Sequence, residues 1–117
     1  MNQTNTQRQM RKGLLEYGVL HIISRGEVYP SDLIDELTQA KLIGIEGVLY
    51  PLLNRLKSEE LITYRWVESE EGPSRKYYSI TEKGKASLKN LANTWKTLVL
   101  SISQITKKKP QPTTITT

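Results

Sequence analysis

The sequence predicts a mainly α-helical protein with one small β-hairpin, and three observations support this fold class. Apolar residues recur at spacings of three and four through the first 60 residues, which is the period of an amphipathic helix. Two runs rich in aromatic and β-branched residues, 61–67 and 75–80, flank a polar turn that contains Gly72 and Pro73. A seven-residue apolar repeat then continues to residue 105.

Composition limits the classes to which the protein can belong. The chain has 117 residues, which is the size of one domain with a modest core. It contains no cysteine and one histidine, which excludes disulfides, thiolate chemistry and a histidine-rich metal site. It has no run of 18 or more apolar residues, and its N-terminus lacks the apolar core of a signal peptide. We therefore expect a soluble cytoplasmic protein with no cofactor and no membrane contact.

The first helix is predicted over residues 8–25, after a loose polar segment at residues 1–7. From Leu14 to Ile23 this helix is apolar over most of its circumference, which is typical of a helix buried against its own domain or a partner. His21 lies inside it, and we expect a structural, hydrogen-bonded role for this histidine.

The second helix is predicted to start near Asp32, with Ser31 as its N-terminal cap, and to end before Gly44. An acidic residue in the first turn is favourable at a helix N-terminus. The inner face of this short helix comprises Leu33, Ile34 and Leu37.

Pro51 indicates where the third helix starts. Proline is tolerated in a first turn, where its missing N–H has no intrahelical partner, so the helix should begin near Gly47 or Val48. A helix whose first turn is small, exposed and hydrogen-bonding can enter the DNA major groove. The predicted outward residues are Glu46, Gly47, Tyr50 and Asn54, and the predicted inward residues are Val48, Leu49, Leu52, Leu53 and Leu56.

The last helix is predicted over residues 82–106, with Thr81 as its N-cap. At about 1.5 Å per residue it is roughly 37 Å long, which is more than so small a domain can cover. A second copy of the chain is therefore the expected partner. The seven-residue seams are Leu88, Trp95 and Ile102, and Leu91, Leu98 and Ile105. Residues 107–117 form a basic, then polar tail that we expect to be disordered.

Three helices followed by a hairpin, in this order, predict a winged helix-turn-helix domain at residues 8–80 and a C-terminal dimerisation helix at 81–106. The charge is unevenly distributed. Residues 72–117 carry nine Lys or Arg and one acid, whereas residues 1–60 carry seven Lys or Arg and eight acids. Such an asymmetry suggests an anionic partner such as nucleic acid or a membrane surface.

The motifs "GVLYPLLNRL", "ELI", "GPSRKYYSIT" and "KG" occur in an order and at spacings that resemble the PadR family of bacterial transcriptional regulators. The resemblance covers residues 12 to about 105, and the single short C-terminal helix resembles the small subgroup of the family. It implies a homodimeric winged-helix repressor that binds double-stranded DNA, and we expect an inverted-repeat operator.

The resemblance also assigns roles to residues. It puts Tyr50 in the recognition helix at the DNA, and Arg75 and Lys76 near phosphates, while Arg55 matches a family position that can serve the fold as much as the DNA. The expected DNA-binding residues are Ser31, Gly47, Tyr50, Asn54, Arg55, Arg75 and Lys76.

Two positions depart from the family pattern. The family glycine after the recognition helix is Glu60 here, so the helix should end without the left-handed glycine that usually caps it. Ser74 occupies the position of the first of the two wing arginines of the family, which predicts weaker binding of phosphates at the wing.

Trp95 lies in the middle of the C-terminal seam. In the multidrug-sensing branch of the family a tryptophan at the matching place lines a pore between subunits and stacks on aromatic ligands. The alternative is that Trp95 only fills the dimer core, and Trp66, in a strand, is expected to pack. The residues of the expected aromatic-effector site are Leu91, Trp95, Leu98 and Val99.

An enzyme is not expected, because neither a nucleophile elbow nor a phosphate-binding loop occurs in the sequence. One alternative to a DNA-binding repressor stays open: a winged-helix dimer that acts as a protein-interaction module and binds no DNA. The acidic residues near the expected DNA face favour this alternative. These are Glu46, Glu68, Glu70 and Glu71.

Overall fold

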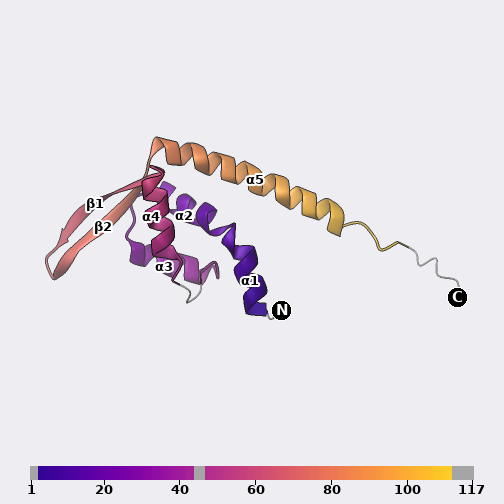
Figure 1. The fold of residues 1–117 in the computed structure, drawn as a ribbon, viewed down its shortest axis with the longest axis horizontal. Helices are drawn as coiled ribbons and strands as arrows, with labels where there is room; N and C mark the ends of the chain where they lie inside the picture. Colours follow the sequence, from indigo (N-terminus) through magenta and orange to yellow (C-terminus); the bar gives the residue numbers. More distant parts are fainter. Residues whose placement is uncertain (1–2, 44–46, 112–117) are drawn as a thin grey trace.

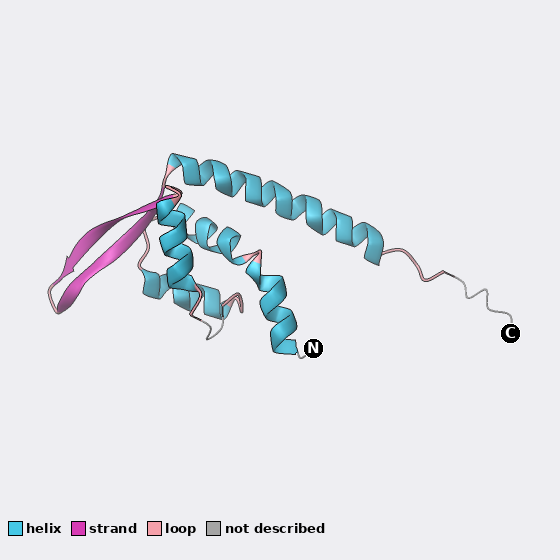
Figure 2. Ribbon diagram, viewed as in Figure 1, coloured by secondary structure: helices cyan, strands magenta, loops and turns pink. Residues whose placement is uncertain are grey.

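The computed structural model describes residues 3–43 and 47–111, and Figure 1 shows their arrangement. It confirms the predicted fold class: a mainly helical protein with one antiparallel hairpin and a long C-terminal helix, as the colours of Figure 2 make plain. The elements are α1 (Gln3–Lys12), α2 (Leu15–Ser24), α3 (Pro30–Gln39), α4 (Leu49–Ser58), β1 (Ile62–Ser69), β2 (Gly72–Ile80) and α5 (Glu82–Thr106).

The hydrophobic core lies where α2, α3, α4 and the base of the hairpin meet. Each of the three helices contributes one apolar stripe at helical spacing, as the sequence periodicity predicts. The side chains with the least exposed surface come from all three helices and from the first residue of β1. They are Val19, Leu20, Ile23, Leu33, Leu37, Leu49, Leu53, Leu56 and Ile62.

The N-terminal region differs from the prediction of one helix over 8–25 after a loose segment. It forms two helices, α1 and α2, and α1 already begins at Gln3. A turn at Gly13 separates them, in which the Leu14 N–H donates to the Arg11 carbonyl at 2.8 Å. Glycine has poor helix propensity, which favours a break at this position. His21 is exposed on α2, with its ring edge-on to that of Tyr17 at 6.4 Å between centroids.

The start of α3 also differs from the prediction. The helix begins at Pro30, and Tyr29 is its N-cap residue with no side-chain capping bond. Proline can begin a helix because its φ is already helical and its missing N–H is not needed there. Ser31 is therefore inside the first turn and does not cap the helix, which leaves its hydroxyl free for the wing.

The interpretation of Pro51 is confirmed, because α4 begins at Leu49 and the proline occupies its first turn. Leu49, Leu53 and Leu56 are buried as predicted. Val48 is a correction: it was expected inside, but it is the N-cap residue before the helix and is 38% exposed. Glu46 lies outside the described residues.

The end of α4 has no left-handed glycine, as predicted. The helix does end in the left-handed conformation, which Glu60 adopts itself with φ of 63°. The next N–H, that of Leu61, donates back to the Leu56 carbonyl at 2.9 Å and satisfies the end of the helix. A glutamate thus occupies a backbone conformation that costs an L-residue about 1–2 kcal/mol.

The hairpin is longer than predicted. Residues Glu70 and Glu71 form its turn, so Gly72 and Pro73 belong to β2 and not to the turn. The register pairs Ile62 with Ile80 at the base, and it shifts at a bulge between Val67 and Ser69 near the tip. Pro73 is accommodated in this two-stranded sheet near the irregular end, where proline's missing N–H is tolerated.

Helix α5 begins as predicted, because the Thr81 hydroxyl accepts a hydrogen bond from the Gly84 N–H at 2.9 Å. Near its start, Leu88 and Leu91 pack against the core. Beyond them the helix extends away from the domain (Figure 1). Its apolar side chains there are exposed in the single chain. The large exposed side chains of this segment are Trp95, Leu98, Val99, Leu100, Ile102 and Ile105.

Candidate nucleic-acid interface

A cleft of about 360 Å³ lies between the start of α3, the first turns of α4 and one face of the hairpin. We call it the wing cleft, and the hairpin with its turn the wing. Five of the seven predicted DNA-binding residues meet there: Ser31, Tyr50, Asn54, Arg75 and Lys76. The complete lining comprises these five together with Pro30, Trp66 and Tyr78.

Arg75 is held at the cleft by two contacts with the start of α3. Its guanidinium donates a hydrogen bond to the Ser31 hydroxyl at 2.8 Å and lies 4.1 Å above the ring of Tyr29. The Tyr29 ring is itself stacked on Tyr77 of β2, with 4.5 Å between centroids. The position of the charge is therefore set before any ligand arrives, although its side chain is exposed.

Lys76 lies on the face of the hairpin opposite to that of Arg75, where two aromatic rings of β1 orient its side chain. Its ammonium lies 4.5 Å from the ring centroid of Tyr64 and 5.5 Å from that of Trp66. Neither ring neutralises the charge, and no carboxylate is close enough to form an ion pair with it among the described residues. The two basic side chains of β2 thus keep their positive charge available at one end of the cleft.

The wall opposite the wing belongs to α4. Tyr50 is 56% exposed, and Asn54, one turn later, is also exposed. Leu49 and Leu53 of the same helix are buried, so packing fixes which side of α4 faces out. A phenol and a carboxamide one turn apart can both donate and accept hydrogen bonds, as the reading of base edges requires.

The remaining two predicted residues do not line the wing cleft. Gly47 is exposed before α4 with φ of 58°. Arg55 donates to Glu16 of α2 at 2.5 Å and also pairs with Glu59 at 3.1 Å. The hydrogen bond to Glu16, above all, raises the pKa of the Arg55 guanidinium. These contacts tie α4 to α2, and we interpret Arg55 as a residue of the fold.

Another ion pair joins the wing to the segment between α2 and α3. Arg65 of β1 donates to Glu27 at 2.8 Å, and this hydrogen bond holds the pKa of the Glu27 carboxyl below its usual value. The same contact raises the pKa of Arg65. Burial raises the pKa of the Tyr78 hydroxyl above its usual value.

Trp66 was expected to pack in its strand, and it does so only in part, against the ring of Tyr64. Its side chain is 60% exposed and lines the wing cleft. Strand alternation places Ile62, Tyr64 and Trp66 on one face, but it does not tell how far along the strand that face stays buried. That face is buried only at the base of the hairpin, because the strand continues beyond the core and exposes its later residues to solvent.

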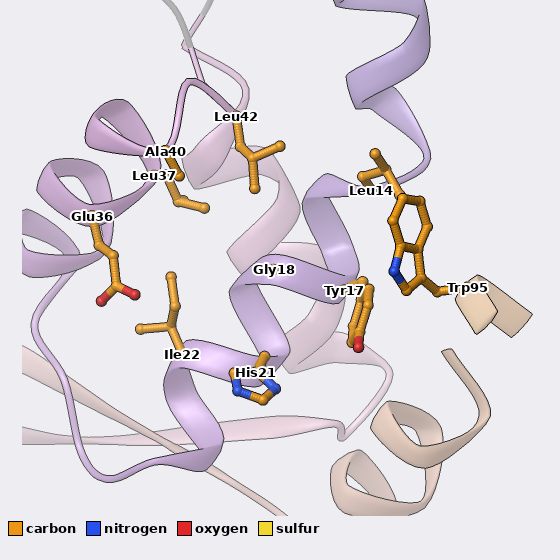
Figure 3. Close-up of a pocket in the computed structure, with 10 residues that line it drawn as sticks. All are labelled: Leu14, Tyr17, Gly18, His21, Ile22, Glu36, Leu37, Ala40, Leu42 and Trp95. Carbon is orange, nitrogen blue, oxygen red and sulfur yellow. The ribbon is translucent and has the colours of Figure 1, made fainter. Parts of the chain in front are cut away.

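A second cavity, of about 490 Å³, lies between α2, α3 and α5, and we call it the α5 cavity (Figure 3). Trp95 reaches from α5 towards Leu14 and Tyr17 in this view. Of the four residues expected at an effector site only Trp95 lines it; Leu91 packs against the core, and Leu98 and Val99 are exposed elsewhere on α5. The cavity adds Tyr17, His21 and Glu36, which the sequence did not indicate. Its remaining lining residues are Gly18, Ile22, Leu37, Ala40 and Leu42.

Within residues 3–43 and 47–111 no three His, Cys, Asp or Glu side chains come together as a metal site would need. Among the same residues no helix combines the length and the apolar character that crossing a bilayer demands.

A three-helix core with a hairpin whose return strand is basic, beside the exposed first turns of its last helix, defines the winged helix-turn-helix class of DNA-binding fold. Residues 19–90 match the sequence model of the transcriptional regulator PadR-like family, and the chain belongs to this family. As a transcriptional regulator of this family it is not an enzyme.

Three known proteins illustrate the similarity. A PadR-like transcription factor from Bacteroides fragilis is 48% identical, with a TM-score of 0.71 over 86% of this chain and 98% of that one. The transcriptional regulator YqjI of Escherichia coli is 36% identical over 81 residues, which are 67% of this chain but 37% of that protein. Bacillus subtilis PadR, solved in complex with operator DNA, shares the fold at 22% identity and a TM-score of 0.59 over 88% of this chain and 52% of that one.

Proposed function

We propose that the protein is a repressor that binds an inverted-repeat operator as a homodimer and is released by a planar aromatic effector. In this proposal residues 8–80 bind the DNA and residues 81–106 join two copies, and most of the predicted tail at 107–117 lies outside the described residues. The observation that carries the proposal is the wing cleft, where hydrogen-bonding side chains of α4 face two unneutralised cations of the wing.

The residues of the wing cleft are suited to two kinds of contact with duplex DNA, one to bases and one to phosphates. Tyr50 and Asn54 read base edges in the major groove, with Gly47 allowing close approach of the backbone. Arg75 and Lys76 contact phosphates, which supply affinity but little sequence information. Ser31 orients Arg75 through its hydrogen bond. The complex of Bacillus subtilis PadR with operator DNA supports this use of the shared fold.

The exposed apolar residues of α5 support the dimer. An uncovered patch of this kind is unusual on a monomer and typical of an interface between subunits. If the two recognition helices occupy successive major grooves, they lie roughly 34 Å apart, and the half-sites are about ten base pairs apart. The operator is then an inverted repeat, because it mirrors the two-fold axis of the protein.

The effector part of the proposal rests on Trp95 and the α5 cavity. Trp95 and Tyr17 present two aromatic rings at an apolar cavity, to which dimerisation adds Leu98 and Val99 of α5, with Leu91 supporting the helix from the core side. Stacking of a planar ligand contributes about 0.5–1.5 kcal/mol per ring beyond area burial. Release of DNA requires that the ligand prefers a dimer with displaced recognition helices, since equal affinity for both arrangements shifts nothing.

The DNA-binding part is tested by fluorescence anisotropy with a duplex of about 30 base pairs that the wild-type protein has selected from a random library. Arg75→Ala and Lys76→Ala should each weaken binding and reduce the salt slope by roughly one unit. Tyr50→Ala should lower specific binding more than non-specific binding. The matched control is Lys89→Ala, an exposed lysine of α5 outside the cleft. Unchanged salt slopes in both wing variants would refute the phosphate contacts.

The effector part is tested by titrating planar dyes into the Trp66→Phe variant, in which Trp95 is the only tryptophan. We expect quenching of its emission at micromolar dye and loss of DNA binding in the same range. Constant emission up to hundreds of micromolar, together with normal induction of a Trp95→Ala variant in cells, would leave Trp95 as a packing residue.

One observation favours the alternative, a dimer that binds protein partners and no DNA. The wing ends in three exposed acids, Glu68, Glu70 and Glu71, which phosphates would repel if the tip itself approached DNA. The same titration decides between the two functions, because a protein-interaction module would select no duplex above non-specific binding.

A further inference from the structure

Trp66 is the largest apolar side chain of the wing cleft, and the proposed phosphate and base contacts leave it without a role. It is 60% exposed, although its strand begins at a fully buried residue, Ile62. The register places Trp66 directly opposite Lys76, and Tyr64 opposite Tyr78. A row of apolar side chains therefore runs from the core along one face of the hairpin and ends at the exposed indole of Trp66.

Contacts within the wing cover only part of the surface of this indole. Its ring meets the Tyr64 ring edge-on, with 6.0 Å between centroids and an angle of 88° between planes. The Lys76 ammonium lies 5.5 Å from its centroid. These contacts hold the ring in one orientation and still leave most of its surface in the cleft, beside Tyr50 and Asn54 of α4.

We propose that Trp66 is a DNA-contacting residue whose indole packs on the apolar surface of duplex DNA, either a deoxyribose or a thymine methyl group. This inference rests on the proposed function, since it needs a duplex in the wing cleft. Phosphates flank the sugars, so the Lys76 ammonium and the Trp66 ring, held side by side, match a phosphate and its adjoining sugar. Thymine methyl groups offer the same apolar chemistry at the base edge.

The contact predicts a loss of affinity without a loss of charge. Trp66→Ala should bind the selected 30-base-pair duplex roughly ten-fold more weakly, the effect of burying a large part of an aromatic side chain. Because no phosphate contact is removed, the salt slope should remain that of the wild type. The substitution leaves the fold intact because the side chain is largely exposed, which circular dichroism checks. Thr63→Ala, an exposed position of the same strand outside the cleft, is the matched control.

A second measurement observes the indole directly. In a Trp95→Phe variant Trp66 is the only tryptophan, and its emission should shift when the duplex is added. Replacing every thymine of the duplex by deoxyuridine then separates the two partners. If the ten-fold difference between wild type and Trp66→Ala persists, the indole packs on a sugar; if it disappears, the indole packs on a thymine methyl group.

Four results would overturn the inference. Equal affinities of wild type and Trp66→Ala would refute it alone, and so would an emission that does not respond to the duplex. A weaker variant whose salt slope falls as much as that of Lys76→Ala would show that Trp66 only orients the lysine. Failure of the wild type to select any duplex would refute the inference and the proposed DNA binding together.

Discussion

Replacing Gly84 by alanine should destabilise the protein, although the same change stabilises an ordinary helix by about 1 kcal/mol. Gly84 is buried in the first turn of α5, directly against Leu61 in the link between α4 and β1. A Cβ atom there would lie 2.0 Å from the Leu61 carbonyl oxygen and 2.7 Å from Cγ1 of Ile80. Both distances are below the 3.0 Å that real Cβ atoms keep, and the nearer atom is backbone.

The cost follows from what must move. The start of α5 has to retreat from Leu61 by about 1 Å to restore 3.0 Å. That shift strains the Thr81 cap, whose hydroxyl accepts from the Gly84 N–H at 2.9 Å and donates to the Glu60 carbonyl at 2.7 Å. Overpacking costs about 1–3 kcal/mol, and loss of a cap costs about 1 kcal/mol. After the gain in helix propensity, the net destabilisation should be about 1–3 kcal/mol.

The assay is urea unfolding followed by circular dichroism at one fixed protein concentration, because a dimer's midpoint depends on concentration. Gly13→Ala is the matched control: the same substitution adds a Cβ with no atom within 4 Å, and it should not lower the midpoint. If Gly84→Ala unfolds at the same or a higher urea concentration than the wild type, the close packing of α5 on Leu61 is refuted.

Four further outcomes follow from the same geometry. Glu60→Gly should raise the free energy of unfolding by about 1 kcal/mol, because glycine adopts the left-handed conformation without strain; an unchanged urea midpoint would contradict it. Leu98→Asp should convert the proposed dimer into a folded 13.4 kDa monomer in sedimentation, since Leu98 is 56% exposed in the single chain. Arg55→Ala should lower stability and leave the salt slope of DNA binding unchanged, whereas a shallower slope would restore a phosphate role. The pKa of the Glu27 carboxyl is lowered in the folded protein, so the stabilisation that it provides should be present above its pKa in the unfolded chain. This stabilisation should be lost as pH falls through the pKa of Glu27 in the folded protein. In NMR titrations, the pKa of Glu27 should be higher in the Arg65→Gln variant than in the wild type.

Local patterns were sufficient for the elements whose causes are local. The leucines of α4 recur at helical spacing, Pro51 can occupy only a first turn, and Thr81 precedes a helix that its hydroxyl caps. The same holds for the long apolar seam of α5, because periodicity is a property of neighbouring residues. The hairpin is predicted correctly, but its turn is predicted over the seven residues 68–74, whereas the structure confines it to Glu70 and Glu71, because cross-strand pairing extends both strands.

The features of the wing cleft depended on residues far apart in the chain. Ser31 looks like a cap in sequence, and only the fold brings the Arg75 guanidinium to its hydroxyl across 44 positions. Arg55 matches a family position, and only the fold brings its guanidinium to Glu16, 39 positions earlier, at 2.5 Å. Burial of a strand face cannot be read from alternation alone, so the exposure of Trp66 was missed.

The sequence by itself determined the order of the elements, the apolar faces of the helices and the concentration of positive charge in the C-terminal half. These properties follow from periodicity, capping and composition, which involve residues a few positions apart. The tertiary structure alone decided which polar side chains share the wing cleft, that Arg55 pairs with Glu16, and that Glu60 takes a conformation usually left to glycine. Each of these depends on packing between distant segments, whose energy can outweigh the local preference of any single residue.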